Sequence, residues 1–507
     1  MMAVGAVAAM GTAVGPAAMA QVDPSAAVDT AAEAYLVIGY RPGAASAELI
    51  PVHAQLGARV VRNIAALHAA VVALPLDTTA AASPLHTTLF GDEAAAAVAL
   101  GNRTTPSPSS PSAAAAAHSA ADHAPVRTAD LAADADRIAA LTAFAAARYG
   151  RLSGVAYVEA DIAAGIDAPV AAADDAAARA AVRSSVDVDD RPAANDLTTG
   201  DPYASQQWHL EATRLPEAWS LVRADGILIA VVDTGVEASH PDLATALLPG
   251  WNARDGSADT RDDHGHGTAI AGVIAAGVGN GLGVAGAAPG ARLLPVKALG
   301  ADGTGWMSDV AAGIVWATDH GARVIVVAAG SRAPLRLLAD AVAYAAANGA
   351  LVVAAAGNAG ADAVDHPAAD PGALAVAAVD AAGGRSAWSN HGAAVRILAP
   401  GEDILTTALS GGYARASGTS LSAGIVGGVA ALLYAQTPDA SPAAIAGRLL
   451  DSAAPGGRFA QDPGDPRRIV DARAAAAERA DGADEPSARL PGYWRKQRPV
   501  WLPAVYR

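Results

Sequence analysis

The stretch SGTSLSAGIVGGVAALL at residues 417–433 decides the fold. Its Ser-Gly-Thr-Ser opening leads into a run of small and apolar residues, which predicts a tightly packed helix over Ser420–Tyr434. A helix N-terminus presents unpaired N–H groups and the positive end of the helix dipole. Serine is commonly a plain N-cap there. A serine oxygen in this place is also well sited to attack a carbonyl, because the same N–H groups can stabilise the resulting oxyanion.

Two stretches further upstream supply the groups that such a serine needs. AVVDTGV at residues 230–236 places Asp233 directly after an apolar strand, and GHGTAIAGVIAA at residues 265–276 places His266 before a small-residue helix. A hydroxyl is a poor nucleophile at neutral pH and needs an imidazole base within reach. A carboxylate buried at a strand end needs a partner, and an imidazole held in one tautomer would provide it.

The order Asp, His, Ser with these flanks resembles the subtilisin-like serine proteases (subtilases) over residues 199–475. The resemblance implies a serine endopeptidase that forms an acyl-enzyme, in which Ser420 attacks, His266 is the base and Asp233 orients His266. Asn358 in VVAAAGN matches the oxyanion asparagine of the family.

The helix after the serine departs from the family pattern. Leu421 and Gly424 stand where the family usually has Met and Pro, and Ala269 stands where it often has a second His. Leu421 conserves the volume of Met. Gly424 is expected to loosen the helix start, which leaves open a catalytically weak or inactive peptide-binding protein of the same fold.

Three other chemistries compete with this interpretation. Asp262-Asp263-His264-Gly265-His266 contains side chains that bind metals, although the helical zinc pattern HExxH is absent. The triplet Asp233-Thr234-Gly235 also occurs in aspartic proteases, which need two such loops, and the sequence has one. An esterase or amidase would use the same triad, so the residues alone do not separate it from a peptidase.

Strands alternating with helices predict a parallel sheet with helices on both faces, the three-layer α/β architecture that the resemblance also implies. In such sheets chemistry gathers at the carboxyl ends of the strands. The expected strands are Ile227–Val232, Arg292–Leu299, Val324–Ala328 and Leu351–Ala356, and the expected helices are Gly267–Ala276, Asp309–His320, Leu335–Asn348 and Ser420–Tyr434.

The resemblance also implies where a peptide substrate binds. In subtilases a peptide adds as a strand to an exposed edge. The segment that aligns with this edge is Val326–Ser331, with Ala328, Ala329 and Gly330 as its contact residues, and only Gly330 keeps the family pattern. Ala354, Ala355 and Gly357 are expected on the facing wall. Small apolar walls favour an apolar substrate side chain.

A structural calcium ion is a further expectation, because two loops resemble the calcium loop of the family. Ca²⁺ prefers carboxylate, amide and carbonyl oxygens at a flexible turn. Ordinary loop chemistry is the alternative. The expected ligands are Asp201, Asp242, Val278, Asn280, Leu282 and Val284.

The N-terminal third resembles the inhibitory propeptide of subtilases, a small α+β ferredoxin-like domain. Strands are expected at Tyr35–Tyr40, Val60–Ile64, Ala69–Leu74 and Val155–Ile162, with helices at Ala45–Leu56 and residues 134–149. The segment Asp77–Ala133, with PSPSSPSAAAAA, has no apolar periodicity and is expected to be disordered. The predicted order is a signal peptide (1–20), the propeptide (33–163), a linker (164–198), the catalytic domain (199–475) and a C-terminal tail (476–507).

Composition limits the partners of this 507-residue chain. Its 34 basic and 50 acidic residues give a net charge of −16, which argues against a nucleic-acid surface. The absence of cysteine excludes disulfides and thiol catalysis. Ala18-Met19-Ala20 before Gln21 fits a signal-peptide cleavage site, although a basic n-region is missing. We expect a secreted monomer without a membrane anchor, which acts on polypeptides and is inhibited by its own propeptide.

Overall fold

The computed structural model describes seven segments of the chain: residues 33–41, 50–56, 58–75, 148–149, 151–166, 200–454 and 469–477. Several predictions fall on residues outside these segments. They are the signal peptide, the insert 77–133, most of the helix at 134–149, the linker from residue 167 on and nearly all of the tail.

A parallel sheet forms the centre of the protease domain. Its seven strands lie in the order β13 (Ile397–Pro400), β12 (Ala373–Val379), β11 (Leu351–Ala355), β10 (Val324–Val327), β6 (Leu228–Asp233), β8 (Arg292–Lys297) and β7 (Trp251–Asn252). The four strands predicted from the sequence are β6, β8, β10 and β11. β12 was not predicted, because its Ala-rich sequence ALAVAAV carries no clear strand pattern.

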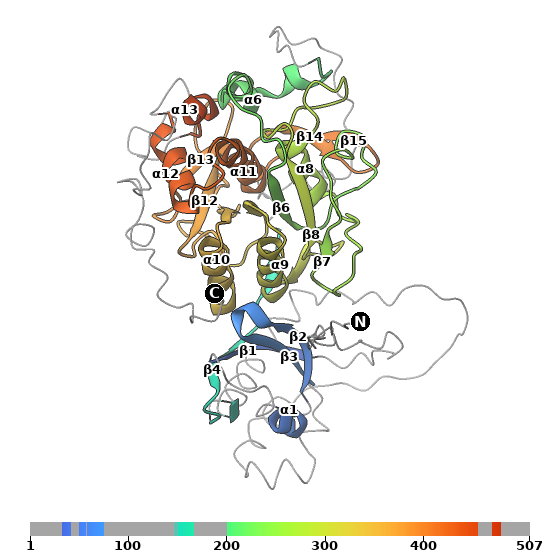
Figure 1. Cartoon of the computed structure of the whole chain (residues 1–507), viewed down its shortest axis with the longest axis vertical. Helices are drawn as coiled ribbons and strands as arrows, with labels where there is room; N and C mark the ends of the chain where they lie inside the picture. Colours follow the sequence, from blue (N-terminus) through green and yellow to red (C-terminus); the bar gives the residue numbers. More distant parts are fainter. Residues whose placement is uncertain are drawn as a thin grey trace, which may run out of the picture. The chain divides into compact units, whose positions relative to one another are not determined.

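Helices cover both faces of this sheet. α8 (His266–Ala275) and α11 (Thr419–Gln436) pack on one face, and α9 (Met307–Asp319) and α10 (Arg336–Ala347) pack on the other (Figure 1). The strands are apolar on both sides, so alternate residues enter different cores. Val324 and Val326 of β10 contact the α11 side, whereas Ile325 and Val327 contact the α9 side. The three-layer α/β prediction is therefore confirmed.

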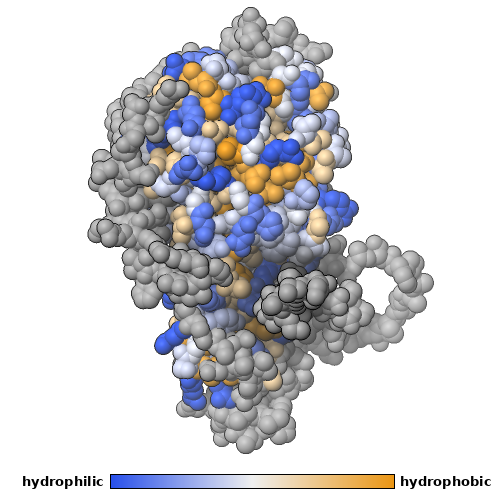
Figure 2. Space-filling view, viewed as in Figure 1, coloured by the Kyte–Doolittle hydropathy of each residue, from blue (hydrophilic) through white to orange (hydrophobic). Residues whose placement is uncertain are grey.

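The remaining elements of this domain lie around the sheet. They are η3 (Ala204–Gln206), α6 (Trp208–Ala212), α7 (Leu215–Trp219), β9 (Thr304–Trp306), the antiparallel hairpin β14 (Ile404–Ala408) and β15 (Gly412–Ala416), α12 (Pro442–Ser452) and α13 (Ala472–Ala477). The visible face of the domain mixes hydrophilic and hydrophobic residues (Figure 2). Among the described residues only α11 is long and apolar enough to cross a membrane, and 89% of it is buried inside the protein as a core helix.

Gly424 is a contact point between two helices and does not loosen α11. The helix continues without interruption through this residue. A Cβ atom at Gly424 would lie 2.7 Å from Cγ2 of Val273 in α8, which is closer than such atoms approach. The expectation of a weakened helix start is therefore wrong, because the missing side chain lets α8 and α11 pack closely.

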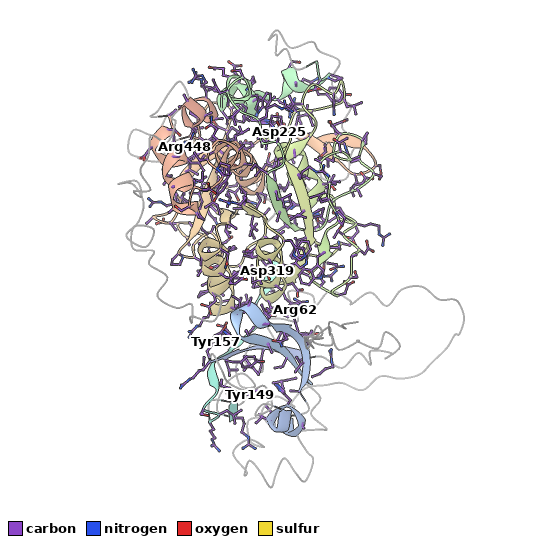
Figure 3. The ribbon with its side chains drawn as sticks, viewed as in Figure 1. Arg62, Tyr149, Tyr157, Asp225, Asp319 and Arg448 are labelled. Atoms are coloured by element: carbon purple, nitrogen blue, oxygen red, sulfur yellow. The ribbon has the colours of Figure 1, made fainter. Side chains whose placement is uncertain are left out.

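The N-terminal region forms a separate four-stranded sheet in the order β2-β3-β1-β4. The pairs β1–β4 and β2–β3 are antiparallel. Tyr149 is fully buried beside this sheet, and its hydroxyl lies 2.8 Å from Nδ1 of His53 in α1 (Figure 3). The predicted propeptide strands and the end of the first helix are thus present. The elements are β1 (Glu33–Tyr40), α1 (Ile50–Leu56), β2 (Arg59–Ile64), η2 (Ala65–Leu67), β3 (Ala69–Pro75) and β4 (Val155–Ala160).

Candidate active site

Four side chains that the sequence singled out come from strand ends and helix starts. Asp233 is the last residue of β6, and Asn358 follows β11. His266 is the first residue of α8, and Ser420 is the second residue of α11. The carboxyl ends of parallel strands lie at one edge of a sheet, where the helix N-termini that follow also begin, so this topology places the four residues toward the same edge.

Asp233 and His266 form a close pair. Nδ1 of His266 lies 2.8 Å from Oδ1 and 2.9 Å from Oδ2 of Asp233, which is completely buried. Burial by itself lowers the pKa of His266, but the Asp233 carboxylate and its hydrogen bond more than offset this effect and raise the pKa above its usual value. Gly267 permits the approach, because a Cβ there would lie 2.0 Å from the carbonyl oxygen of Gly235.

Asp262 stabilises the turn before α8, where both of its carboxylate oxygens accept hydrogen bonds. Its Oδ1 accepts hydrogen bonds from the backbone N–H groups of His264 and Gly265, and its Oδ2 accepts from the N–H and hydroxyl of Thr268. Within the described segments no group of three or more His, Cys, Asp or Glu side chains is arranged to hold a metal ion. The described residues therefore give no support to the alternative of a metal site at residues 262–266.

Ser420 lies beside the end of β10. Its side chain is buried, and its hydroxyl donates a 3.2 Å hydrogen bond to the carbonyl oxygen of Ala328. Among the described residues no hydrogen bond joins this hydroxyl to His266. Catalytic hydrogen bonds often tighten only when substrate is bound.

Asn358 is held against the start of α11 and shares a small space with the backbone of Ser420. Its Oδ1 accepts hydrogen bonds of 2.9 Å from both the N–H and the hydroxyl of Thr419, which fixes the amide orientation. A Cβ atom at Gly418 would lie 3.7 Å from Nδ2 of Asn358 and 3.8 Å from the backbone N of Ser420. These two N–H donors therefore border the same space, which is suited to an oxyanion.

The predicted substrate walls follow β10 and β11, which are adjacent strands. Val326 and Val327 are not at an exposed edge, because β10 pairs with β6 on one side and β11 on the other. That part of the edge prediction is wrong. The free edge begins only after the strand, at residues 328–331. Ala354, Ala355 and Gly357 form the end of β11 and its continuation.

A short strand from the N-terminal region pairs with this edge. Gly165 in β5 (Ala163–Gly165) exchanges both backbone hydrogen bonds with Gly330, at N···O distances of 3.0 and 3.2 Å. On its other side β5 pairs antiparallel with β9. β5 is thus the middle strand of three, and it contains the residues where the sequence placed the start of the linker. The sequence analysis missed β9, whose only signal is the glycine pattern of GADGTGW.

Two acidic residues of the N-terminal region cap helices of the protease domain. Glu159 in β4 accepts hydrogen bonds of 3.1 Å from the backbone N–H groups of Arg336 and Leu337 at the start of α10. Asp161 accepts a 3.1 Å bond from the N–H of Ser308 at the start of α9. The oxygens of these two side chains satisfy N–H groups that the first turns of α9 and α10 leave without a partner inside the helix.

Comparison with known proteins identifies the family of this chain. The model of the Subtilase family matches residues 224–482. Thermitase from Thermoactinomyces vulgaris is 42% identical over 245 residues, which are 48% of this chain and 88% of thermitase. The chain belongs to the subtilase family. Subtilisin BL from Lederbergia lenta is 39% identical over 250 residues, 49% of this chain and 91% of that protein.

A solved structure supports the same assignment for this subtilase. A protease from Pseudoalteromonas arctica PAMC 21717 superimposes with a TM-score of 0.52 at 33% identity, and the match covers 55% of this chain and 99% of that one. The protein is therefore a serine endopeptidase by family. The Asp233–His266 pair, Ser420 and the two facing N–H donors are the groups that acyl transfer requires.

The loop predicted to bind calcium brings the side chains of Asp201, Asp242 and Asn280 together. Oδ1 of Asp242 accepts a 2.7 Å bond from Nδ2 of Asn280, and the two oxygens of Asp201 accept from the N–H groups of Gly279 and Gly281. In the described part of the chain the carbonyl oxygens of Val278, Leu282 and Val284 accept no hydrogen bond. Oxygens of these three kinds are what Ca²⁺ prefers, so the donor set fits the ion.

Proposed function

We propose that this subtilase is a secreted serine endopeptidase, made as a zymogen, that cleaves peptide bonds through Ser420, His266 and Asp233. The hydroxyl of Ser420 attacks the peptide carbonyl and gives its proton to Nε2 of His266. Asp233 holds Nδ1 of His266 and stabilises the imidazolium that forms. The developing oxyanion accepts hydrogen bonds from Nδ2 of Asn358 and the N–H of Ser420.

The intermediate then collapses, the peptide C–N bond breaks, and His266 gives its proton to the leaving amine. The acyl group remains on Ser420 as an ester. A water molecule, deprotonated by His266, attacks this ester. The bond between the acyl carbon and the Ser420 oxygen then breaks, His266 returns the proton to that oxygen, and the acid is released. Two observations support the proposal: the 2.8 Å pair of Asp233 and His266, and the two N–H donors that border one space beside Ser420.

Labelling with a serine-reactive fluorophosphonate tests this assignment. The wild-type protein should be labelled and should hydrolyse casein, whereas Ser420→Ala should do neither. Comparing casein with a simple ester separates a peptidase from an esterase or amidase. A wild-type protein that takes up no label would support the alternative of an inactive peptide-binding member of the fold.

The zymogen part of the proposal rests on β5. The strand occupies the edge at Gly330 and pairs antiparallel with it, as a peptide substrate would. Secretion rests on the signal-like sequence at residues 1–20. Residues 33–163, extended to Ile166 to include β5, should inhibit the mature enzyme when added in trans, with or without the insert 77–133. Absence of inhibition at micromolar concentration beside an active enzyme would contradict an inhibitory role.

We further propose that one Ca²⁺ ion is bound by the oxygens of Asp201, Asp242 and Asn280 together with the carbonyls of Val278, Leu282 and Val284. The ion would hold the loop after α8 against the segment at Asp242. Its contribution is to stability, and no step of the reaction passes through it.

A further inference from the structure

A buried carboxylate that the catalytic mechanism does not use lies between the ends of β10 and β11, in the space that the two predicted substrate walls border, which we call the crevice. Asp365 is 2% exposed. A Cβ atom at Gly357 would lie 2.1 Å from its Oδ2, and one at Gly330 would lie 3.7 Å from the same oxygen. The carboxylate therefore lies between the two predicted substrate walls, over glycines that leave room for it.

The backbone holds this residue against both walls. The N–H of Asp365 donates a 3.1 Å bond to the carbonyl of Ala356, after β11. The next residue, His366, exchanges backbone hydrogen bonds with Ser331, beyond β10. The carboxylate is thus a fixed part of the crevice.

The crevice adjoins the nucleophile. The hydroxyl of Ser420 contacts the carbonyl of Ala328 on one wall, and the hydroxyl of Thr419 accepts a 3.1 Å bond from the N–H of Gly357 on the other. Antiparallel counting from the Gly165–Gly330 pair places the position two residues after Gly165 opposite Ala328. In a peptide bound in the register of β5, the residue opposite Ala328 therefore brings its carbonyl to Ser420. The side chain of the same residue enters the crevice.

Asp365 already binds a cation that reaches it from the surface. Nε of Arg332 lies 3.0 Å from Oδ1 of Asp365; the Arg332 side chain is 50% exposed, whereas that of Asp365 is 3% exposed. The other charged groups nearby pair with each other, since Nδ1 of His366 lies 2.5 Å from Oδ1 of Asp370. The crevice thus accepts a guanidinium from the solvent side.

We propose that Asp365 makes this protease select lysine or arginine at the substrate residue that donates the scissile carbonyl. A substrate side chain that enters the crevice displaces Arg332. An apolar side chain in that place would remove the ion pair between Arg332 and Asp365 and put no charge in its place, which is costly. A basic side chain replaces the lost ion pair with one of the same kind. This inference rests on the proposed function, and it replaces the apolar preference that the small walls alone suggested.

The test uses peptide p-nitroanilides built on the sequence of β5 and the residue after it. The series Ala-Ala-Gly-Ile-X-p-nitroanilide copies residues 163–166, and X is Arg, Phe or Asp, the last being the chain's own residue 167. The mature enzyme, matured from the full chain, is titrated with the fluorophosphonate so that rates refer to active sites. Asp365→Asn removes the charge and keeps the shape. Asp225→Asn is the matched control, because Asp225, labelled in Figure 3, is an exposed carboxylate whose ion-pair partner is Arg223.

We expect kcat/KM for Arg to exceed that for Phe by at least about tenfold, with Asp the poorest substrate. Asp365→Asn should bring the Arg-to-Phe ratio close to one, and Asp225→Asn should leave it unchanged. If the wild-type enzyme prefers Phe, the inference is overturned and the proposed function stays intact. This outcome can be measured without any variant. A ratio unchanged in Asp365→Asn would also overturn it. Absence of labelling and of hydrolysis would overturn the proposed function, and this inference with it.

Discussion

Nδ1 of His266 lies within 2.9 Å of both carboxylate oxygens of Asp233, across the junction between the end of β6 and the start of α8. This pair sets the charge state of the base. Because Asp233 raises the pKa of His266 above its usual value, neutral imidazole becomes available only at higher pH.

The pH dependence of kcat/KM should report this pair. Activity should rise with pH as His266 loses its proton. Asp233→Asn removes the charge that raises the pKa, while burial still lowers it, so the inflection should move to lower pH. The rate at the plateau should fall by on the order of 10⁴, the magnitude known from serine proteases of this chemistry. An unchanged inflection in the variant would show that Asp233 does not control the base.

Ser420→Ala should abolish hydrolysis without unfolding the protein. The change removes one oxygen at the start of α11, and the hydrogen bond to Ala328 is the only one its hydroxyl makes in the described structure. The expected loss in turnover is on the order of 10⁶, a value known from subtilisin itself. If maturation is autocatalytic, the full-length precursor should accumulate. Casein hydrolysis at the wild-type rate would contradict the role of Ser420.

Gly418→Ala should slow the chemical step selectively. Its methyl group would occupy the space bordered by Nδ2 of Asn358 and the N–H of Ser420, at distances that cause no clash. The backbone of Gly418 is extended, so alanine fits without strain. We expect kcat to fall by on the order of 10²–10³ with a smaller change in KM, as for loss of the corresponding donor in subtilisin itself. Asn358→Ala is the comparison. The double variant should lose little more kcat than either single variant alone.

Chelation should destabilise the wild-type protein. A ligand bound only to the native state at 100 times its Kd stabilises that state by about 2.7 kcal/mol, so EDTA should lower Tm by several degrees. Asp242→Ala should abolish the difference between Tm with and without EDTA. Asp242 also bonds to backbone N–H groups and Tyr413, so the readout is this difference and not Tm itself. A wild-type Tm indifferent to EDTA would mean that the loop binds no calcium.

Binding of the N-terminal region should weaken as the pH rises. Burial, with a smaller contribution from Asp309, raises the pKa of Asp161 to about 7 from an ordinary value of 3.8. The complex therefore holds a proton that the separated region releases, and inhibition in trans should weaken about tenfold per pH unit between pH 4 and 7. Asp161→Asn keeps an acceptor for the N–H of Ser308 but carries no charge. If inhibition by the wild type and by the variant weakens with pH in the same way, Asp161 is not the group that causes the pH dependence.

The sequence by itself determined the protease fold and its reacting groups. Asp233, His266 and Ser420 each stand at the boundary of an apolar strand or a small-residue helix, and such boundaries are local patterns. Because carboxyl strand ends and helix starts meet at one edge of a parallel sheet, the local patterns predict that the three residues lie near one another, and the structure pairs Asp233 with His266. The strands of the N-terminal sheet were predicted for the same reason.

Only the tertiary structure decided how the substrate cleft is built. The pairing of Gly165 with Gly330, the crossing of α8 and α11 at Gly424 and the place of Asp365 between two walls join residues far apart or in irregular loops. No period or cap marks such residues, because what fixes them is the close packing of separate segments. The sequence therefore predicted small apolar substrate walls, and packing placed a buried carboxylate between them.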